Sequence, residues 1–365
     1  MMRRGTFFTF VSAAYDNNAQ LSGTLYRWDV TTPAAPMTTP VDAIVSGGYS
    51  ILEMAGGRDW FSNVSFTLAL RNDYTVWAWA EGSTSYYPYT TSPIQISFSA
   101  AASIMHIAAD TEACFAIDSA GKLWSWGNYW VMGVGGFAAN SYLTPKLVSA
   151  TGSFVSVNTR VSSAMALRSD GLLLAWGDNA ERQLGHAGAG NTPDLVVGGI
   201  TFVKFRVGGG TVPSVGIGNI NGTLYTWGRN LESQCGIPPA TATVSSPIAI
   251  ATSFVDVLNV SARAAAIHAL TGDVWTWGAG FASYAPAWHA TTTHVMTNRS
   301  FGTSLKSFVR STTLPYALDG SNNIWGWYGV PVGTGTQATS VPTRVSAAAT
   351  FQDALIIGSF GQGLG

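Results

Sequence analysis

Apolar residues along this chain come in short runs that end at glycine, proline, aspartate or asparagine, and none keeps the spacing of an amphipathic helix. One kind of run recurs through the whole sequence: an aliphatic residue, an apolar and usually aromatic residue, any residue, and then tryptophan. The seven copies end at Trp28, Trp79, Trp126, Trp176, Trp227, Trp277 and Trp327. Because the positions three and two before each tryptophan are both apolar, we expect a β-strand that is covered on both faces.

Three further apolar runs accompany each tryptophan strand. Ala164 to Leu167 lies just before one of them and is joined to it by Arg168-Ser169-Asp170-Gly171. Asp-Gly between apolar runs favours a tight hairpin. Farther upstream comes a run such as Phe154 to Val157, and a fourth run begins with proline, as in Pro145 to Val148, a position where strands tolerate proline. The pattern therefore predicts four short strands in every repeat.

The repeats have nearly constant length. Successive tryptophans are separated by 47 residues (Trp79 to Trp126) to 51 residues (Trp28 to Trp79). Four strands at such a period, repeated seven times, predict an all-β, seven-bladed β-propeller of four-stranded antiparallel blades. Because one repeating unit spans the chain, residues 1–365 are predicted to form a single propeller domain.

The two chain ends are predicted to share one blade. The residues after Trp327 contain the apolar run Ala354 to Gly358 but no further tryptophan strand. Thr6 to Ala14 is predicted to be a strand, and we expect it to join the C-terminal blade and close the ring. The alternative is a secretory signal at Met1-Met2-Arg3-Arg4 and the phenylalanines that follow, but that apolar run is short and lacks a clear cleavage site.

The turn after the tryptophan strand carries a family resemblance. Trp176 to Gly185 reads Trp-Gly-Asp-Asn-Ala-Glu-Arg-Gln-Leu-Gly, and Trp227 to Gly236 is nearly as close. Both resemble the regulator of chromosome condensation (RCC1-like) repeat, Trp-Gly-x-Asn-x-x-Gly-Gln-Leu-Gly. The resemblance implies a seven-bladed propeller, in agreement with the count. That family includes exchange factors for a small GTPase, an ultraviolet-B photoreceptor, β-lactamase inhibitors and phage or bacterial surface proteins, but none of their functional residues can be carried over to this chain.

The composition limits the kinds of partner that this chain is expected to bind. Only 10% of residues are charged, against about 25% in a typical soluble domain, and the formal net charge is −1. Because no basic stripe is present, we expect no nucleic-acid binding. No apolar run is long enough for a transmembrane helix, so no membrane insertion is expected. Cys114 and Cys235 fall at different places in their repeats and are predicted to be buried thiols rather than a disulfide.

No catalytic, cofactor-binding or metal-binding constellation is visible. His289 and His294 are near one another, but no acidic residue lies at a ligand's spacing from them. Gly-rich pieces such as Gly208 to Gly210 lack the lysine of a phosphate loop and are interpreted as turns. Asp16 to Asn18 and Asp319 to Asn323 could bind calcium, although hairpin-turn chemistry alone accounts for them. We therefore predict that the chain is not an enzyme and holds no cofactor.

Three of the 14 tryptophans lie outside the strand motif: Trp60, Trp130 and Trp288. Antiparallel strands place the loops that contain these three on one face of the ring, and Tyr86, Tyr87 and Tyr89 lie in a loop of the same class. Aromatic residues on loops of a rigid scaffold are typical interface anchors. These six residues are the predicted partner-binding site, and the alternative is that they pack over neighbouring blades.

The function predicted from these features is a non-enzymatic platform for protein partners. Low charge, Thr/Ser/aromatic-rich loops and a bare propeller favour a structural or host-attachment component of a virion, such as a phage tail or capsid, or of another extracellular assembly. One alternative is a soluble regulator or inhibitor that binds one partner protein. Another is a lectin, because aromatic residues on a face can stack on surface glycans. The expected localisation is a virion or the extracellular space, with the cytoplasm as the alternative.

Overall fold

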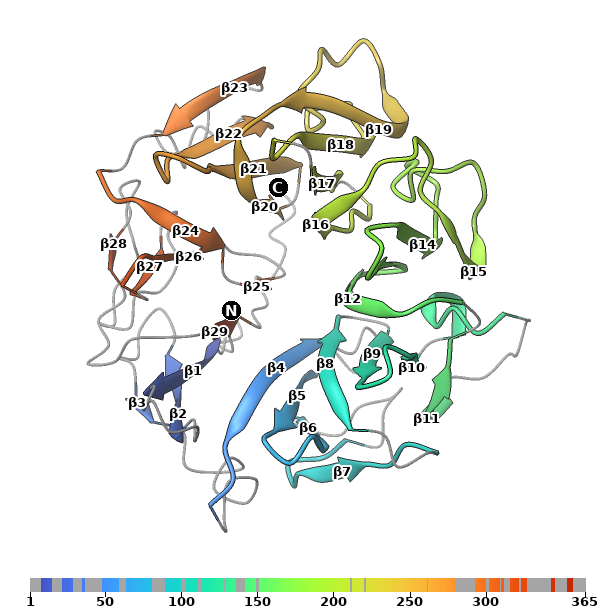
Figure 1. Cartoon of the computed structure of the whole chain (residues 1–365), viewed down its shortest axis with the longest axis vertical. Coiled ribbons are helices and arrows are strands. Elements are labelled where there is room, and N and C mark those ends of the chain that lie inside the picture. Colours follow the sequence, from blue (N-terminus) through green and yellow to red (C-terminus); the bar gives the residue numbers. More distant parts are fainter. Residues whose placement is uncertain are drawn as a thin grey trace, which may run out of the picture.

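The computed structural model shows an all-β chain arranged as a ring of sheets (Figure 1). It describes residues 48–58, 64–80, 89–99, 103–110, 113–127, 129–135, 142–148, 151–210, 212–219, 221–260, 262–279, 293–299, 302–308, 316–321 and 323–326, and the strands at 8–14, 22–28, 35–36, 310–311, 343–344 and 353–356. The one helical element in these residues is a short 3-10 turn, η1 (Tyr129–Val131).

Six antiparallel sheets have four strands each, and neighbours in a sheet are consecutive along the chain except that β25 lies between β24 and β26. They are β4 (Ile51–Arg58), β5 (Ser65–Arg71), β6 (Val76–Ala80) and β7 (Ile94–Ile96); β8 (Ile104–Ala109), β9 (Ala113–Asp118), β10 (Leu123–Gly127) and β11 (Tyr142–Leu147); β12 (Phe154–Arg160), β13 (Ser163–Arg168), β14 (Leu173–Gly177) and β15 (Gly190–Leu195); β16 (Phe202–Arg206), β17 (Ser214–Gly218), β18 (Leu224–Arg229) and β19 (Thr243–Ala251); β20 (Phe254–Val260), β21 (Arg263–His268), β22 (Val274–Gly278) and β23 (Thr293–Arg299); and β24 (Leu305–Phe308), β26 (Tyr316–Asp319), β27 (Ile324–Gly326) and β28 (Thr343–Arg344). The prediction of four-stranded antiparallel propeller blades is confirmed for these sheets.

Each blade begins at the centre of the ring and ends at its rim (Figure 1). The innermost strand is the apolar run that lies two strands before the tryptophan strand, and the outermost strand is the run that follows it. The outermost strand contains or directly follows a proline in every one of these blades except that of β23. The hairpin between the second and third strands uses glycine as expected. Gly171 has a φ of +84°, and a Cβ there would lie 2.1 Å from Thr201 Cγ2. This turn therefore sits against the chain that leads into the next blade.

The remaining sheet has five strands and joins the two ends of the chain. Its order is β25 (Arg310–Ser311), β29 (Asp353–Ile356), β1 (Phe8–Ala14), β2 (Ser22–Trp28) and β3 (Ala35–Pro36). β1 pairs antiparallel with β29, with Phe10 opposite Ala354, and β25 adds a parallel pairing. The prediction of seven equal blades is therefore corrected to six blades of the expected kind. The first tryptophan repeat lies in this mixed sheet, which takes strands from three separate parts of the chain.

Neighbouring blades are held together by apolar side chains between their faces. One core cluster joins Phe115 of β9 to Phe154, Leu174 and Trp176 of the next blade. The ring of Phe115 meets that of Trp176 edge-on, with centroids 5.7 Å apart. Trp126, Trp176, Trp227 and Trp277 are among the largest side chains that are fully buried. Burial of an indole removes roughly 150–250 Å² of surface from water, so these residues dominate the contact between blades.

All six innermost strands carry a β-bulge at the same place. The pairing register shifts by one residue around Leu52, Met105, Val155, Val203, Val255 and Lys306. Each bulge is followed by a polar residue, and these six are Glu53, His106, Ser156, Lys204, Asp256 and Ser307. An extra residue bends the strand and redirects the neighbouring side chains. The inner strands thus bring one polar position from each blade towards the centre, and we call these six residues the polar ring.

Candidate functional site

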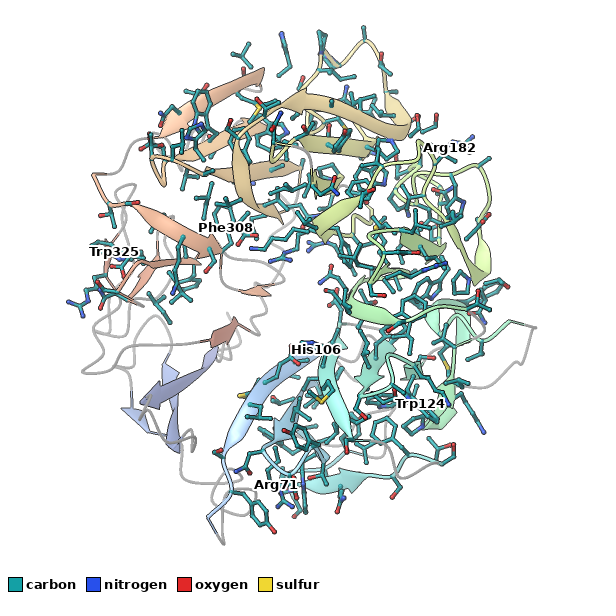
Figure 2. All side chains as sticks on the ribbon, viewed as in Figure 1. Arg71, His106, Trp124, Arg182, Phe308 and Trp325 are labelled. Carbon is teal, nitrogen blue, oxygen red and sulfur yellow. The ribbon has the colours of Figure 1, made fainter. Side chains whose placement is uncertain are left out.

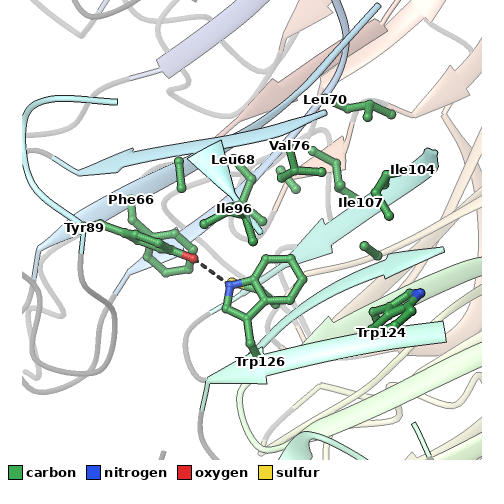
Figure 3. Close-up of a cluster of buried hydrophobic side chains, with 14 of the residues drawn as sticks. Phe66, Leu68, Leu70, Val76, Tyr89, Ile96, Ile104, Ile107, Trp124 and Trp126 are labelled. Carbon is green, nitrogen blue, oxygen red and sulfur yellow. Dashed lines mark hydrogen bonds between the residues drawn. The ribbon is translucent and has the colours of Figure 1, made fainter. Parts of the chain in front are cut away.

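Tyr89, one of the predicted partner-binding residues, is part of the core (Figure 3). Its side chain is only 1% exposed, and its hydroxyl accepts a hydrogen bond of 2.7 Å from Trp126 Nε1. The ring also packs at 5.6 Å from Phe66. Burial raises the pKa of Tyr89 well above its ordinary value, so the phenol stays neutral. The prediction that Tyr89 contacts a partner is therefore wrong, because its ring fills the space between two blades.

Three other blade tryptophans make the same kind of contact. Each indole donates from one blade to a backbone carbonyl in a loop of the preceding blade. The bonds are Trp176 Nε1 to Val131 O at 2.6 Å, Trp227 Nε1 to Gln183 O at 2.8 Å and Trp277 Nε1 to Gln234 O at 2.9 Å. The hydroxyl of Tyr89 takes the place of that carbonyl in the β4–β7 blade. These bonds satisfy the buried indole nitrogens and fix the spacing of the blades.

The loops that carry the family signature are also used for structure. Asn179 Oδ1 accepts from Leu184 N at 3.0 Å, and its Nδ2 donates to the carbonyls of His186 and Gly188. Gln183 Nε2 donates to Asp178 Oδ2 at 2.8 Å. Asn230 repeats this role in the next blade, where Cys235 N donates to its Oδ1 at 3.0 Å. The signature therefore reports the fold of the loop and leaves its function open.

Trp130 is the predicted partner-binding residue whose side chain the structure describes as exposed. It lies in η1, in the β10–β11 connection, and is 47% exposed. The next two residues, Val131 and Met132, are buried, and the Met132 carbonyl accepts a hydrogen bond of 2.7 Å from Ser125 Oγ. Gly133 N donates to Asn191 Oδ1 at 2.6 Å. The loop is thus anchored directly after an indole that is half exposed. Trp60, Tyr86, Tyr87 and Trp288 lie outside the described residues, so their role stays a prediction.

A central channel runs between the innermost strands. The cavity has a volume of about 410 Å³ and is lined by β4, β8, β12, β16, β20 and β24. Figure 2 places His106 and Phe308 beside this opening, whereas Arg71, Arg182 and Trp325 lie towards the rim. Cavities of this size accommodate small-molecule ligands in other proteins. The channel was missed by the sequence analysis because the bulges that present the polar ring leave no signal in an apolar run.

Two acids of the polar ring connect neighbouring blades. Glu53 Oε2 accepts from Ile107 N at 2.8 Å, and Asp256 Oδ2 accepts from Phe308 N at 2.8 Å. Asp256 also accepts from Val257 N at 2.9 Å and pairs with Lys204 Nζ at 3.2 Å. Both carboxylates are buried but well supplied with donors. They therefore act as struts between inner strands, since a buried charge is tolerated when it is paired and hydrogen-bonded.

Two further charged residues, Asp110 and Arg160, lie at the opposite end of the inner strands. Asp110 follows β8 and accepts a hydrogen bond of 3.1 Å from Val161 N, and Arg160 is the last residue of β12. Both line the channel. Burial lowers the pKa of the Arg160 guanidinium, and the charge of Asp110 only partly offsets this effect. Arg160 Nε is buried without a hydrogen-bond partner. This end of the channel lies on the same face of the ring as Trp130. Successive connections between antiparallel strands alternate between the two faces, and this places the β10–β11 and β12–β13 connections on one face.

The other candidate chemical groups, the two cysteines and the Asp319 cluster, are accounted for by burial and turn hydrogen bonds. Cys114 and Cys235 are buried free thiols, as predicted, and burial raises the pKa of Cys235 to about 12. Asp319 accepts hydrogen bonds from Ser321 N, Asn323 N and Trp325 Nε1, which is turn chemistry. In the part of the chain that the structure describes, no three His, Cys, Asp or Glu residues come close enough to share a metal ion, and no helix is long and apolar enough to span a bilayer.

No family model matches this sequence. Two curated proteins are similar to this chain: the E3 ubiquitin-protein ligase HERC2 of Mus musculus and that of Homo sapiens. Each is 27% identical over 183 residues, which is 46% of this chain and only 4% of the relative. The chain thus corresponds to a small part of these relatives.

Solved structures with a similar fold cover almost the whole chain. Human WBSCR16 superposes with a TM-score of 0.71 at 15% identity, over 94% of both chains. Prp20p from Saccharomyces cerevisiae superposes with a TM-score of 0.68 at 18% identity, over 94% of this chain and 86% of that one. That structure was described together with the binding of Prp20p to Gsp1p and histones. At these identities the likeness concerns the architecture of the ring.

Proposed function

We propose that this chain, a β-propeller of the RCC1-like kind, is a non-enzymatic module that binds a protein partner through one face of its ring. The face is the one that carries the β10–β11 loop and the Arg160 end of the channel. The observation that supports this role is the exposed indole of Trp130 on an anchored loop. An indole that is held rigid and exposed loses little entropy on binding, which is why tryptophan is enriched among interface hot spots.

A protein partner is favoured over the alternatives by the likeness to Prp20p, which binds Gsp1p and histones. Under this reading the chain is a regulator or inhibitor of one partner. Attachment within a virion or another extracellular assembly, and a localisation there, remain a more specific proposal that rests on the low charge and the aromatic loops. Glycan binding rests on the same aromatic residues, and a glycan array would test it.

The proposal is tested by comparing two exposed apolar residues on opposite faces. Leu270 is 87% exposed in the β21–β22 turn, on the face opposite Trp130. A photo-crosslinking residue at position 130 should capture the partner in the native host, and the same residue at position 270 should not. With the isolated partner, Trp130→Ala is expected to weaken binding by about tenfold or more, the effect of a hot spot. Leu270→Ala is the matched control and should bind like the wild type.

Equal losses in the two variants would contradict the choice of face. A large drop in the melting temperature of Trp130→Ala would show instead that the indole packs over its neighbours. We expect a change in stability of no more than about 0.5 kcal/mol, as for other surface substitutions.

The five-stranded sheet is proposed to serve as the seventh blade and to close the ring. The antiparallel pairing of β1 with β29 supports this role. Because Phe10 and Ala354 are cross-strand partners, Phe10→Cys combined with Ala354→Cys should form a disulfide under mild oxidation. A bond between the chain ends should raise the melting temperature by several degrees, since it closes a very long loop. Mass spectrometry of the cross-linked peptides is the readout, and failure to cross-link in the folded protein would refute closure by this pairing.

A further inference from the structure

The central channel holds a guanidinium, that of Arg160, whose charge the described residues offset only in part. Three arginines have a buried Nε without a hydrogen-bond partner: Arg160, Arg168 and Arg229. Arg168 pairs with Asp170 at 2.6 Å, and Arg229 pairs with Glu181 at 2.9 Å. Among the residues that the structure describes, Arg160 has no such carboxylate within ion-pair distance. A cation that lines a cavity without a partner lowers stability unless something else neutralises it.

The acids of the channel are already engaged with other donors. Glu53 accepts from the backbone of β8, and Asp256 accepts from two backbone nitrogens and pairs with Lys204. Asp110 raises the pKa of Arg160 through its charge, but its Oδ2 accepts from Val161 N, and the described residues show no ion pair between Asp110 and Arg160. Arg160 Nε is therefore a donor at this end of the channel that lacks an acceptor among the described residues, and an acceptor from outside would satisfy it.

The segment that passes beside the end of β12 carries no side chains, because it consists of glycines. Gly208, Gly209 and Gly210 pass next to the end of β12, and Gly209 has Arg160 O as the nearest atom to an ideal Cβ, at 3.2 Å. A Cβ at Gly210 would meet nothing within 4 Å. These glycines were interpreted as a turn, and the Gly209–Val212 bridge confirms that reading. These glycines do not line the channel, and the guanidinium of Arg160 meets no side chain from them.

We propose that the Arg160 end of the central channel binds a small organic monocarboxylate. The planar guanidinium matches a carboxylate with two parallel hydrogen bonds. A monoanion is favoured over a phosphate dianion because one cation lacks a partner while Asp110, Glu53 and Asp256 remain nearby as negative charges. The cavity of about 410 Å³ is large enough for a short apolar chain, and its lining includes Val157, Val207 and Phe308. This site lies on the proposed protein-binding face, but its binding test requires no protein partner, and the inference goes beyond the protein-binding role.

The test uses hexanoate as the carboxylate probe and inorganic phosphate as the competing anion, with the full-length protein. Saturation-transfer NMR and calorimetric titration should show saturable binding of hexanoate and weaker binding of phosphate. Arg160→Met keeps the length of the side chain and removes its charge, and it should weaken hexanoate binding by about tenfold or more. Arg168→Met, an arginine of the same blade on the opposite face, is the control and should bind like the wild type.

Two further measurements make the outcome decisive. Asp110→Asn keeps an acceptor for Val161 N but removes the opposing charge, so hexanoate should bind several-fold more tightly. Removal of an unpaired cation should leave the melting temperature of Arg160→Met unchanged or higher. The proposal is overturned by absence of hexanoate binding, by equal binding to Arg160→Met, or by phosphate that binds as tightly as hexanoate. Should Arg160→Met fail to fold, unchanged binding by Asp110→Asn would overturn it.

Discussion

Each blade has two levels, the tryptophan strand and the polar ring, and the choice of residue is constant at the first and variable at the second. At the tryptophan strand, Trp126, Trp176, Trp227 and Trp277 occupy one position in four blades, and each indole donates to the loop of the preceding blade. At the polar ring, the residue after the bulge differs in almost every blade: glutamate, histidine, serine, lysine, aspartate and serine. The first level repeats one contact, and the second presents different chemistry at equivalent backbone positions.

The difference separates what the fold requires from what it leaves free. A buried indole between two sheets must be the same in each blade, because the gap that it fills is the same. A side chain beside the channel meets its own set of neighbours, so its identity is set locally. Function in repeat folds is therefore expected where equivalent positions diverge, and the channel and the loop tips are such places here.

The largest effect is expected at the repeated level. Trp227→Ala should lower the free energy of unfolding by about 3–5 kcal/mol, because it opens a cavity between two blades and removes one of the two donors to Gln183 O, the other being Ser214 Oγ. Chemical denaturation monitored by circular dichroism is the measurement. Trp130→Ala is the control, since it removes an indole that is half exposed. Similar losses in both variants would show that position in the blade does not decide the role of a tryptophan.

A smaller effect is expected at the polar ring. Asp256→Ala should destabilise by about 2 kcal/mol, because it leaves Phe308 N and Lys204 without their acceptor. Asp256→Asn keeps one acceptor oxygen and should lose less. Urea titrations of the three proteins at pH 7 provide the comparison. If Asp256→Ala leaves the free energy of unfolding unchanged, the contact between β20 and β24 does not stabilise the fold, and Asp256 has no structural role.

The smallest effect is expected at an exposed turn that belongs neither to the tryptophan strand nor to the polar ring. A hydrogen bond from Arg71, with others from Thr75, lowers the pKa of Asp73 from its ordinary value of 3.8 to about 2. Because the folded-state pKa is the lower one, the stabilisation is present above about pH 4 and is lost as the pH falls towards 2. Asp73→Asn should therefore cost less than about 1 kcal/mol at pH 6, since the pair is solvent-exposed.

That pH dependence can be measured by comparing urea midpoints of wild type and Asp73→Asn at pH 6, 4 and 2.5. The gap between the two proteins should narrow as the pH falls. Asp194→Asn serves as the control, because Asp194 is an exposed carboxylate whose recorded hydrogen bond is with the adjacent Leu195 N. A gap that stays constant across this range would mean that the Arg71–Asp73 pair does not stabilise the fold.

The architecture could be predicted from sequence because one strand motif repeats at nearly constant spacing. The order of strands and the Asp-Gly hairpins follow directly from that motif, as Gly171 illustrates. The count of equal blades could not, because the first tryptophan repeat lies in a sheet built from both chain ends. Tyr89 was placed on the surface because no pattern shows that a phenol hydroxyl replaces a backbone carbonyl. The sequence does not single out Arg160, because its significance depends on the lack of an ion-pair partner among the described residues, which only the folded chain reveals.

The direction of the indole hydrogen bonds has a consequence for how such rings change size. Every described bond runs from a tryptophan to the loop about one period earlier in the chain, so donor and acceptor belong to different blades. Deletion or duplication of one whole period, wherever it starts, removes or adds one donor together with one acceptor. The gene can therefore gain or lose one repeat, wherever the repeat starts, without leaving an indole nitrogen without its acceptor. The curvature of the ring, rather than the hydrogen bonds between blades, limits how many repeats it holds.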